Sequence, residues 1–393
     1  MIDVTGVPRP RVLIFQPALA PYRLHIYNEI AKHCELKVIF LRENLLNQKF
    51  DQSKLRAELK IDYEYLTTGF TIGTRSFRFG INKKIDIFSP DVVITVEFSP
   101  VTIAVSLSKL IRGNRYSHVI WTDDNLESVA LDNLLRRMLR PLLLPLANGI
   151  IVVSEEAALM YSEKFNFHDV IGVVPIIQSE QVFTNQLVES AHMAAQLQQK
   201  HGLQNSRIIL FVGRMATEKR IGRLLEAMLV IKAMPEYADV RAVLVGDGPE
   251  LVGLKALAEE LKIADRVLFV GRHEGVALVA WYRLAAVFVL PSAFERFGAV
   301  VNEALLAGVP VICSTKVGAR ELIRHHVNGE VVDCDVGNGL VVALAHWLRH
   351  SVSLSQLFQQ PLRPSLMPVT FQDAVYGFLK VIREVSSRNR EAI

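Results

Sequence analysis

One stretch decides the fold of this chain: Phe294-Glu-Arg-Phe-Gly-Ala-Val-Val-Asn-Glu-Ala-Leu-Leu-Ala-Gly308. It follows an apolar run over 287–292 that is typical of a buried strand ending in a Pro-Ser turn. Gly298 predicts a tight turn into a helix over about 299–307, which Gly308 and Pro310 would end.

This stretch places two carboxylates beside the start of a helix. Glu295 is predicted to lie in the loop, and Glu303 on the first or second helical turn. Backbone N–H groups near Gly298 point towards the same space and offer a site for an anion. Because carboxylates accept hydrogen bonds from hydroxyls and a helix start receives phosphate, these residues favour a ligand with both groups, such as a sugar nucleotide.

Strand-like runs alternate with helical stretches along most of the chain, a pattern that predicts parallel sheets covered by helices. The predicted strands cover 12–15, 36–40, 92–96, 119–121, 150–153, 170–174, 208–212, 240–245, 267–270, 287–290 and 309–312. A chain of 393 residues is too long for one ordinary core. We therefore predict an α/β protein with two doubly wound, Rossmann-like domains.

The domain boundaries follow from where the alternation stops. Residues 1–175 form the predicted first domain, and a polar stretch over 176–206 the region between the domains. The alternation restarts in a second domain over 207–370, and an amphipathic helix begins near Phe371 within a last segment, 371–393.

Composition narrows the class of protein. The net charge is only +4, which gives no case for nucleic-acid binding, while the 50% hydrophobic content suggests contact with a membrane surface. Three cysteines far apart argue against a disulfide framework or a zinc site and fit a reducing compartment. The start of the chain lacks the apolar run of a signal peptide, and the most apolar segment, 141–153, is too broken to span a bilayer. We therefore expect a cytoplasmic location.

Loops that follow parallel strands are where such folds bind ligands. The first loop ends in Tyr22 and Arg23, which either contact an acceptor or belong to a proline-rich turn. This loop lacks the G-x-G-x-x-G pattern of dinucleotide sites. The second contains Asp123 and Asp124. We expect at least one to cap a helix, and an acid here could otherwise orient an acceptor hydroxyl. With no third ligand near them in the sequence, a metal is not expected.

The loop over 213–220 opens the second domain and contains Gly213, Arg214 and Lys219. Exposed cations are commonly only solvated, but at the carboxyl end of a strand they favour phosphate binding. The turn over 246–249 is predicted to be structural, and the loop over 271–275 is a weak candidate for contacts to a base or its phosphates.

A helix near 131–140 is amphipathic. Leu131, Leu134, Leu135, Met138 and Leu139 share one face, and Arg136, Arg137 and Arg140 lie opposite. We expect the leucine face to pack on the first sheet and the arginines to be solvated. The alternative is that the arginine face docks on anionic lipid.

With these residues in place, the chain resembles the retaining family-4 glycosyltransferases of the GT-B fold (glycosyl transferases group 1). The motifs that carry the resemblance are Gly213-Arg-x4-Lys219, Gly246-Asp-Gly-Pro249, the pair Glu295 and Glu303 with Phe297-Gly298, the run 303–314, Gly318-Ala-Arg-Glu321 and Asn328-Gly329. The resemblance is strong over 207–332. Before residue 207 it is weaker and rests on Ala20-Pro-Tyr-Arg23 and Ile151-Val-Val-Ser154.

The resemblance implies a role for each matching residue. Arg214 and Lys219 would hold the nucleotide diphosphate, Glu303 the ribose hydroxyls and Glu295 the donor sugar, with the backbone of Phe297, Gly298 and Ala299 near sugar and phosphate. It also implies two domains facing across a cleft, a last helix that crosses back onto the first domain, and retaining, metal-independent transfer without a cofactor.

Two departures concern the first domain. Many relatives have a Gly-Gly pair in the first loop, where this chain has Ala18 and Ala20. Many also have a histidine near the reacting carbon, where this chain has Trp121-Thr-Asp-Asp124; His118 lies on the strand and is predicted to be structural.

These expectations combine into one function. We predict a hexosyltransferase-type enzyme that moves a sugar from a UDP- or GDP-sugar to a hydroxyl of a lipid-linked or polysaccharide acceptor in cell-surface glycan biosynthesis, at the inner face of the cytoplasmic membrane. The alternatives are a nucleotide-sugar epimerase on the same fold and a degenerate relative that binds or scaffolds without catalysis.

Overall fold

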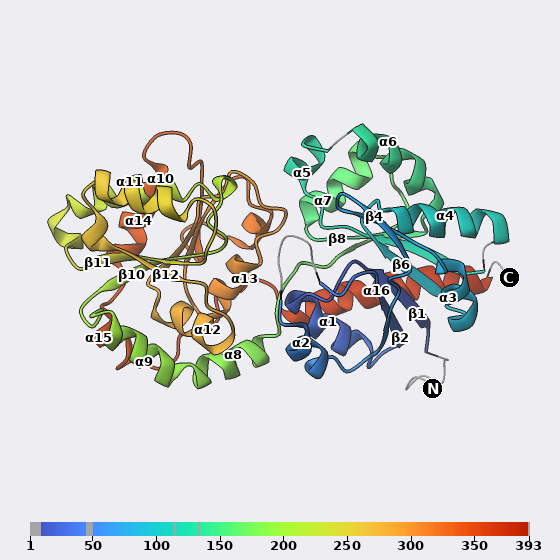
Figure 1. Cartoon of the computed structure of the whole chain (residues 1–393), viewed down its shortest axis with the longest axis horizontal. Helices are drawn as coiled ribbons and strands as arrows, with labels where there is room; N and C mark the ends of the chain where they lie inside the picture. Colours follow the sequence, from blue (N-terminus) through green and yellow to red (C-terminus); the bar gives the residue numbers. More distant parts are fainter. Residues whose placement is uncertain (1–8, 45–49, 114, 133, 392–393) are drawn as a thin grey trace. The chain divides into compact units, whose positions relative to one another are not determined.

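The computed structural model describes residues 9–44, 50–113, 115–132 and 134–391 (Figure 1). They form two compact units. The first contains the described residues up to Ile176 together with those from Phe371 onward, and the second runs from Ile177 to Thr370.

The first unit is built on a seven-stranded parallel sheet with the order β3-β2-β1-β6-β7-β8-β9. Its strands are β1 (Arg11–Gln16), β2 (Glu35–Phe40), β3 (Asp62–Tyr65), β6 (Val92–Val96), β7 (Ser117–Trp121), β8 (Gly149–Val152) and β9 (Val170–Val173), beside an antiparallel pair, β4 (Gly69–Ile72) and β5 (Arg75–Arg78). Its helices are α1 (Pro21–Ile30), α2 (Gln52–Glu58), α3 (Ile81–Phe88), α4 (Pro100–Arg112), α5 (Leu126–Ala130), α6 (Leu134–Leu143), α7 (Glu155–Leu159) and α16 (Phe371–Glu391).

The second unit has a six-stranded parallel sheet with the order β12-β11-β10-β13-β14-β15. Its strands are β10 (Arg207–Val212), β11 (Val240–Val245), β12 (Val267–Gly271), β13 (Val287–Leu290), β14 (Val311–Ser314) and β15 (Gly329–Val332). Its helices are α8 (Glu180–Glu189), α9 (Ala191–Lys200), α10 (Ile221–Lys232), α11 (Leu251–Glu260), α12 (Gly275–Leu284), α13 (Ala299–Leu306), α14 (Gly339–Arg349) and α15 (Leu354–Leu357).

Short helical turns complete both units: η1 (Leu144–Leu146), η2 (Met160–Lys164), η3 (Thr217–Lys219), η4 (Pro235–Tyr237), η5 (Ala264–Arg266) and η6 (Gly318–Leu322). Among the described residues, no helix has both the length and the apolar character needed to cross a bilayer.

The predicted α/β class with two doubly wound sheets is confirmed. Each predicted strand overlaps an observed one, and the apolar run predicted at 309–312 becomes β14 two residues later. The prediction missed β3, β4, β5 and β15. These strands are only four residues long and mix polar with apolar side chains, as in Asp62-Tyr-Glu-Tyr65, so the sequence has no continuous apolar run there.

The stretch that we expected to lie between the domains is helical and belongs to the second unit. Helices α8 and α9 bury Phe183, Leu187, Ala194 and Leu197, and both pack on α12. Their apolar side chains are spaced for a helix, although the segment as a whole is polar.

The last helix packs on the first unit's sheet. In Figure 1, α16 (red) lies among the blue strands and helices from the start of the chain. Two glycines allow a close approach: a Cβ atom at Gly172 on β9 would overlap Val381, and one at Gly377 would lie 2.5 Å from the Val173 carbonyl oxygen. The ring of Phe378 packs 5.0 Å from that of Trp121, centre to centre.

Helix α6 has the opposite orientation from the one predicted. Its leucine-rich face points outward, with Leu134 73%, Met138 57% and Leu142 65% exposed, and Leu131 and Leu135 are exposed too. Leu139 packs partly on the core of the first unit, as expected.

Two of the three arginines that we expected in solvent are enclosed. Arg140 is 1% exposed and pairs with Asp124 at 2.8 Å and Asp132 at 2.5 Å, while Arg136 pairs with Glu97 and Asp132. Only Arg137 is exposed. An unpaired buried carboxylate is more costly than exposed leucine, so these acids turn the arginine face inward. A lipid-docking face made of Arg136, Arg137 and Arg140 is therefore wrong.

Candidate functional site

The second sheet has a point at which its strand order reverses. From β10 the chain first builds outward through β11 and β12, and then returns to build outward through β13, β14 and β15 on the other side. The loops after β10 and β13 consequently diverge, and in open parallel sheets ligands bind beyond the carboxyl ends of the strands at such a reversal. The predicted donor residues lie in these two loops and on the helix α13.

Close backbone contacts support the loop after β10. Gly246 has a φ of 146°, and a Cβ atom there would overlap the carbonyl oxygen of Gly213. The Met215 N–H donates to the Asp247 carbonyl oxygen at 2.8 Å. The turn over 246–249 thus holds the loop that carries Arg214 and Lys219.

The loop after β13 requires glycine at one position. Gly298 has a φ of 94° and caps the start of α13, and an added Cβ atom would lie 3.2 Å from Val317 and 3.3 Å from Leu290. The Gly318 N–H donates to the Glu295 carbonyl oxygen at 3.1 Å, and the Ala319 N–H to the Phe297 carbonyl oxygen at 2.6 Å. These bonds fix the loop against η6.

An ion pair joins the two loops. The Lys219 ammonium donates to Glu295 Oε1, and the Ser292 hydroxyl lies 3.4 Å from the same oxygen. Burial and then the positive charge of Arg214 lower the pKa of Lys219 to about 8, against the opposing effect of Glu218. Three predicted residues, Arg214, Lys219 and Glu295, are therefore electrostatic neighbours, and Arg214 itself is exposed.

Glu303 lies one helical turn into α13 with both carboxylate oxygens bonded. The Tyr282 hydroxyl donates to Oε2 at 2.8 Å, and the Gln178 amide donates to Oε1 at 2.9 Å. Burial raises the pKa of Glu303 to about 7, although the two donors act in the opposite direction. Near neutral pH this carboxyl is therefore balanced between its charged and neutral forms.

Three of the predicted acceptor-side residues gather in the first unit. Arg23 is 3% exposed, bonds Asp123 at 2.5 Å and lies 3.9 Å from the centre of the Trp121 ring. Burial alone would lower the pKa of Arg23, but Asp123 together with Tyr27 and Tyr22 more than offsets this and raises the pKa. Tyr22 is half-buried beside them, and its pKa is raised by burial and then by the charge of Asp123.

Asp124 does not belong to this group. Its carboxylate is fully buried, bonded to Arg140 at 2.8 Å and to the Tyr161 hydroxyl at 2.7 Å. The prediction that Asp123 or Asp124 caps the following helix is also wrong, because the side chain of Asn125 caps α5 by accepting from the Ser128 N–H. The structure thus assigns Asp124 to the interior of the first unit.

His118 is buried as expected. Its ring lies 2.9 Å from the Thr95 hydroxyl and 3.4 Å from the Ser106 hydroxyl, and burial lowers its pKa to about 3. It is therefore neutral at physiological pH.

Some residues at the site had no signal in the sequence. Tyr282 and Gln178 were missed because each is far from Glu303 in the chain, and Gln178 lies in the polar stretch over 176–206 that we expected between the domains. In the first unit, Glu97 has a left-handed φ of 60° just beyond β6 and accepts from the Asp123 N–H at 3.2 Å. A positive φ cannot be read from a glutamate in a sequence.

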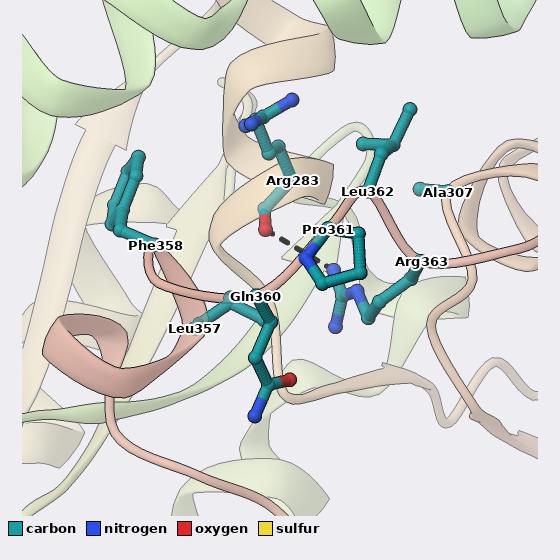
Figure 2. Close-up of a pocket in the computed structure, with 8 residues that line it drawn as sticks. All are labelled: Arg283, Ala307, Leu357, Phe358, Gln360, Pro361, Leu362 and Arg363. Carbon is teal, nitrogen blue, oxygen red and sulfur yellow. Dashed lines mark hydrogen bonds between the residues drawn. The ribbon is translucent and has the colours of Figure 1, made fainter.

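A small pocket in the second unit is lined by none of the predicted donor residues (Figure 2). It lies between α12 and the segment over 357–363 and has room for about 20 Å³, close to the size of a single water. Arg363 reaches beneath Pro361 and donates to the carbonyl oxygens of Tyr282, Arg283 and Ala285 at 2.6 to 3.2 Å. These contacts cap the end of α12, so this pocket is structural.

Comparisons with known proteins point to one family. The model for glycosyl transferases group 1 matches residues 194–357. The chain is 39% identical over 125 residues to an uncharacterized glycosyltransferase of Methanocaldococcus jannaschii, covering 32% of this chain and 31% of that protein. It is 33% identical over 178 residues to N-acetyl-alpha-D-glucosaminyl L-malate synthase of Bacillus anthracis, covering 45% of each. The chain thus spans less than half the length of these curated relatives.

A solved structure is similar over almost the entire chain. The crystal structure of Anabaena Alr3699/HepE in complex with UDP superposes with a TM-score of 0.69, covering 97% of this chain and 99% of that one at 16% identity. At this identity the similarity shows the fold.

Proposed function

We propose that this chain, which belongs to the glycosyl transferases group 1 family and has the GT-B fold, transfers a sugar with retention from a UDP- or GDP-sugar to an acceptor hydroxyl. The observation that carries the proposal is the Lys219–Glu295 ion pair beside Arg214, at the point where the second sheet reverses its strand order.

The donor would be held by opposite charges. Arg214 and Lys219 would contact the diphosphate, and the start of α13 would add the partial positive charge of a helix terminus. Glu295 would accept hydrogen bonds from hydroxyls of the donor sugar once Lys219 pairs with the diphosphate instead. Because two cations and a helix start can neutralise the departing diphosphate, the proposed transfer needs neither a metal nor a cofactor.

Glu303 would receive the ribose hydroxyls. Each carboxylate oxygen has two lone pairs, so the bonds from Tyr282 and Gln178 leave capacity for a ribose donor. Phe297, Gly298 and Ala299 would supply backbone groups near the sugar and phosphate. In the first unit, Tyr22 and the Arg23–Asp123 pair remain the proposed acceptor contacts.

The acceptor is proposed to be lipid-linked or a polysaccharide of the cell surface, with the protein at the inner face of the cytoplasmic membrane. The lipid contact would be the exposed apolar face of α6, formed by Leu134, Met138 and Leu142, with the exposed Leu110 and Ile111 on the adjoining helix α4. Arg137 is the exposed cation on α6 that would meet anionic headgroups.

Donor turnover tests the activity. Purified protein is incubated with UDP- and GDP-sugars and a membrane extract as acceptor source, and transfer of labelled sugar is measured. Lys219→Ala should lower kcat by about a hundredfold or more, the range seen when one charge-stabilising group is removed. Lys200→Ala, an exposed lysine at the end of α9, is the matched control and should leave transfer unchanged. Full transfer by Lys219→Ala would contradict the proposal.

Vesicle sedimentation tests the lipid contact separately. The wild type should bind vesicles that contain phosphatidylglycerol, and Leu134→Glu with Leu142→Glu should abolish binding. Leu229→Glu, which changes an exposed leucine of the second unit, should not. Equal binding by all three proteins would rule out the apolar face of α6 as the lipid contact.

A further inference from the structure

A cluster of histidines surrounds a buried carboxylate at the edge of the second sheet. His326 lies just before β15, Glu330 lies on β15, and His346 lies on α14. One potential ligand atom from each of the three residues lies within 4.8 Å of the others. Three ligands from three separate elements therefore meet at one point, which no single sequence motif would show.

Both oxygens of Glu330 face imidazole nitrogens. Glu330 Oε1 lies 2.8 Å from His326 Nδ1, and Oε2 lies 2.7 Å from His325 Nδ1. The His326 N–H also donates to Oε1, at 3.2 Å. The rings of His326 and His346 are 5.4 Å apart, centre to centre, so the second imidazole adjoins the first.

The backbone at His326 is unusual. Its φ of 61° is left-handed, a conformation that costs a residue with a Cβ atom about 1–2 kcal/mol. The side chains of His325 and His326 are mostly exposed, whereas Glu330 is buried beneath them. The carboxylate is thus fixed in the protein, and the imidazoles are reachable from solvent.

We propose that His326, Glu330 and His346 form a binding site for a divalent transition metal, Zn²⁺ being the best match. Two imidazoles and a carboxylate are a ligand set that zinc accepts, with water in the fourth position. Magnesium and calcium favour oxygen ligands throughout, which excludes them here.

The ligand atoms need only small movements. Two ligand atoms of a tetrahedral zinc at about 2.0–2.1 Å are roughly 3.3 Å apart. The 2.8 Å contact between His326 and Glu330 would open slightly as the metal replaces the shared proton, and the His346 ligand atom already lies within 4.8 Å of both. His325 would keep its bond to Oε2 and orient the carboxylate, as partners of metal ligands commonly do.

This site is distinct from the donor site. The donor residues follow β10 and β13, whereas Glu330 is on β15, which is the edge strand and pairs only with β14 among the described strands. A metal at the cluster would tie this strand to α14. Its effect would be on the stability of the second unit, and the proposed transfer would remain metal-independent.

Direct metal binding tests the proposal on untagged, chelator-treated protein, because a polyhistidine tag would bind zinc by itself. Equilibrium dialysis against ZnCl₂ followed by elemental analysis should give one Zn²⁺ per chain, and the melting temperature should rise with zinc. His346→Ala and His326→Asn should each weaken binding by at least about tenfold. Ala favours the helix and Asn tolerates a left-handed φ, so both variants should fold.

His192→Ala is the matched control, since it removes an exposed histidine of α9 in the same unit. It should bind zinc like the wild type. The proposal is overturned if the wild type takes up no more zinc than a His326→Asn/His346→Ala double variant, or if His192→Ala weakens binding as much as the cluster variants do.

Discussion

Glu303 combines a partly buried position with a pKa close to neutrality. Its folded pKa of about 7 lies above the ordinary value of 4.5, so the folded chain holds more protons than the unfolded chain between these values. The free energy of unfolding therefore falls as pH rises from about 4.5 to 7, and stays reduced above 7.

This pH dependence predicts how Glu303→Gln changes the free energy of unfolding. Glutamine cannot ionise but keeps an acceptor for Gln178 and can donate to the Tyr282 hydroxyl. The variant should gain about 1–3 kcal/mol of unfolding free energy over the wild type at pH 8, with little gain at pH 4.5. Urea unfolding at both pH values measures this. A gain of equal size at both would show that the carboxyl does not titrate as described.

Lys219 gives a second pH dependence, which concerns nucleotide affinity. With a pKa of about 8 in the free protein, its ammonium loses its proton as pH rises through 8. The affinity for UDP or GDP should then fall by up to tenfold per pH unit. Lys219→Arg should keep the affinity constant to higher pH, because guanidinium remains charged. Calorimetric titration from pH 7 to 9 measures both; parallel curves would exclude Lys219 as a phosphate contact.

At the residue scale, the sequence identified side chains whose position follows from strand ends. Arg214, Lys219 and Glu295 could be found because they come directly after apolar strands. Tyr282 and Gln178 could not, since only packing brings them to Glu303. Asp123 and Asp124 are adjacent in sequence, but one faces Arg23 and the other faces Arg140, a difference that depends on tertiary structure.

At the scale of elements, α13 depends on the glycine that precedes it. Gly298→Ala forces a Cβ atom into a left-handed backbone, tight against Val317 and Leu290, and should cost about 1–2 kcal/mol. Gly253→Ala on α11 meets nothing within 4 Å and should instead stabilise by about 0.5–1 kcal/mol. Thermal unfolding of both variants measures the contrast, and a stabilised Gly298→Ala would contradict the described turn.

Helix α6 shows where pattern reading fails. Its amphipathic spacing was correct, yet periodicity alone does not say which face is buried. The acids Glu97, Asp124 and Asp132 decide it, and they come from outside the helix. For α13, by contrast, the flanking glycines fixed both ends within one residue of the prediction.

At the scale of the whole molecule, the last segment of the chain completes the first unit. The described residues from Phe371 onward belong with those up to Ile176, although the second unit separates them in sequence. A chain ending at Thr370 should lose the Phe378–Trp121 contact and the cover over β8 and β9.

Calorimetry of that truncated chain should therefore show a lower unfolding temperature for the first unit and an unchanged one for the second. Residues 177–370 expressed alone provide the reference for the second unit. Equal destabilisation of both transitions would mean that α16 supports the second unit as well.

A crystal structure with bound UDP or GDP would show whether the loops after β10 and β13 receive a nucleoside diphosphate. We expect phosphate oxygens within hydrogen-bonding distance of Arg214 and Lys219, and ribose hydroxyls at Glu303. A nucleotide bound elsewhere, with Lys219 and Glu295 still paired and untouched, would contradict this expectation.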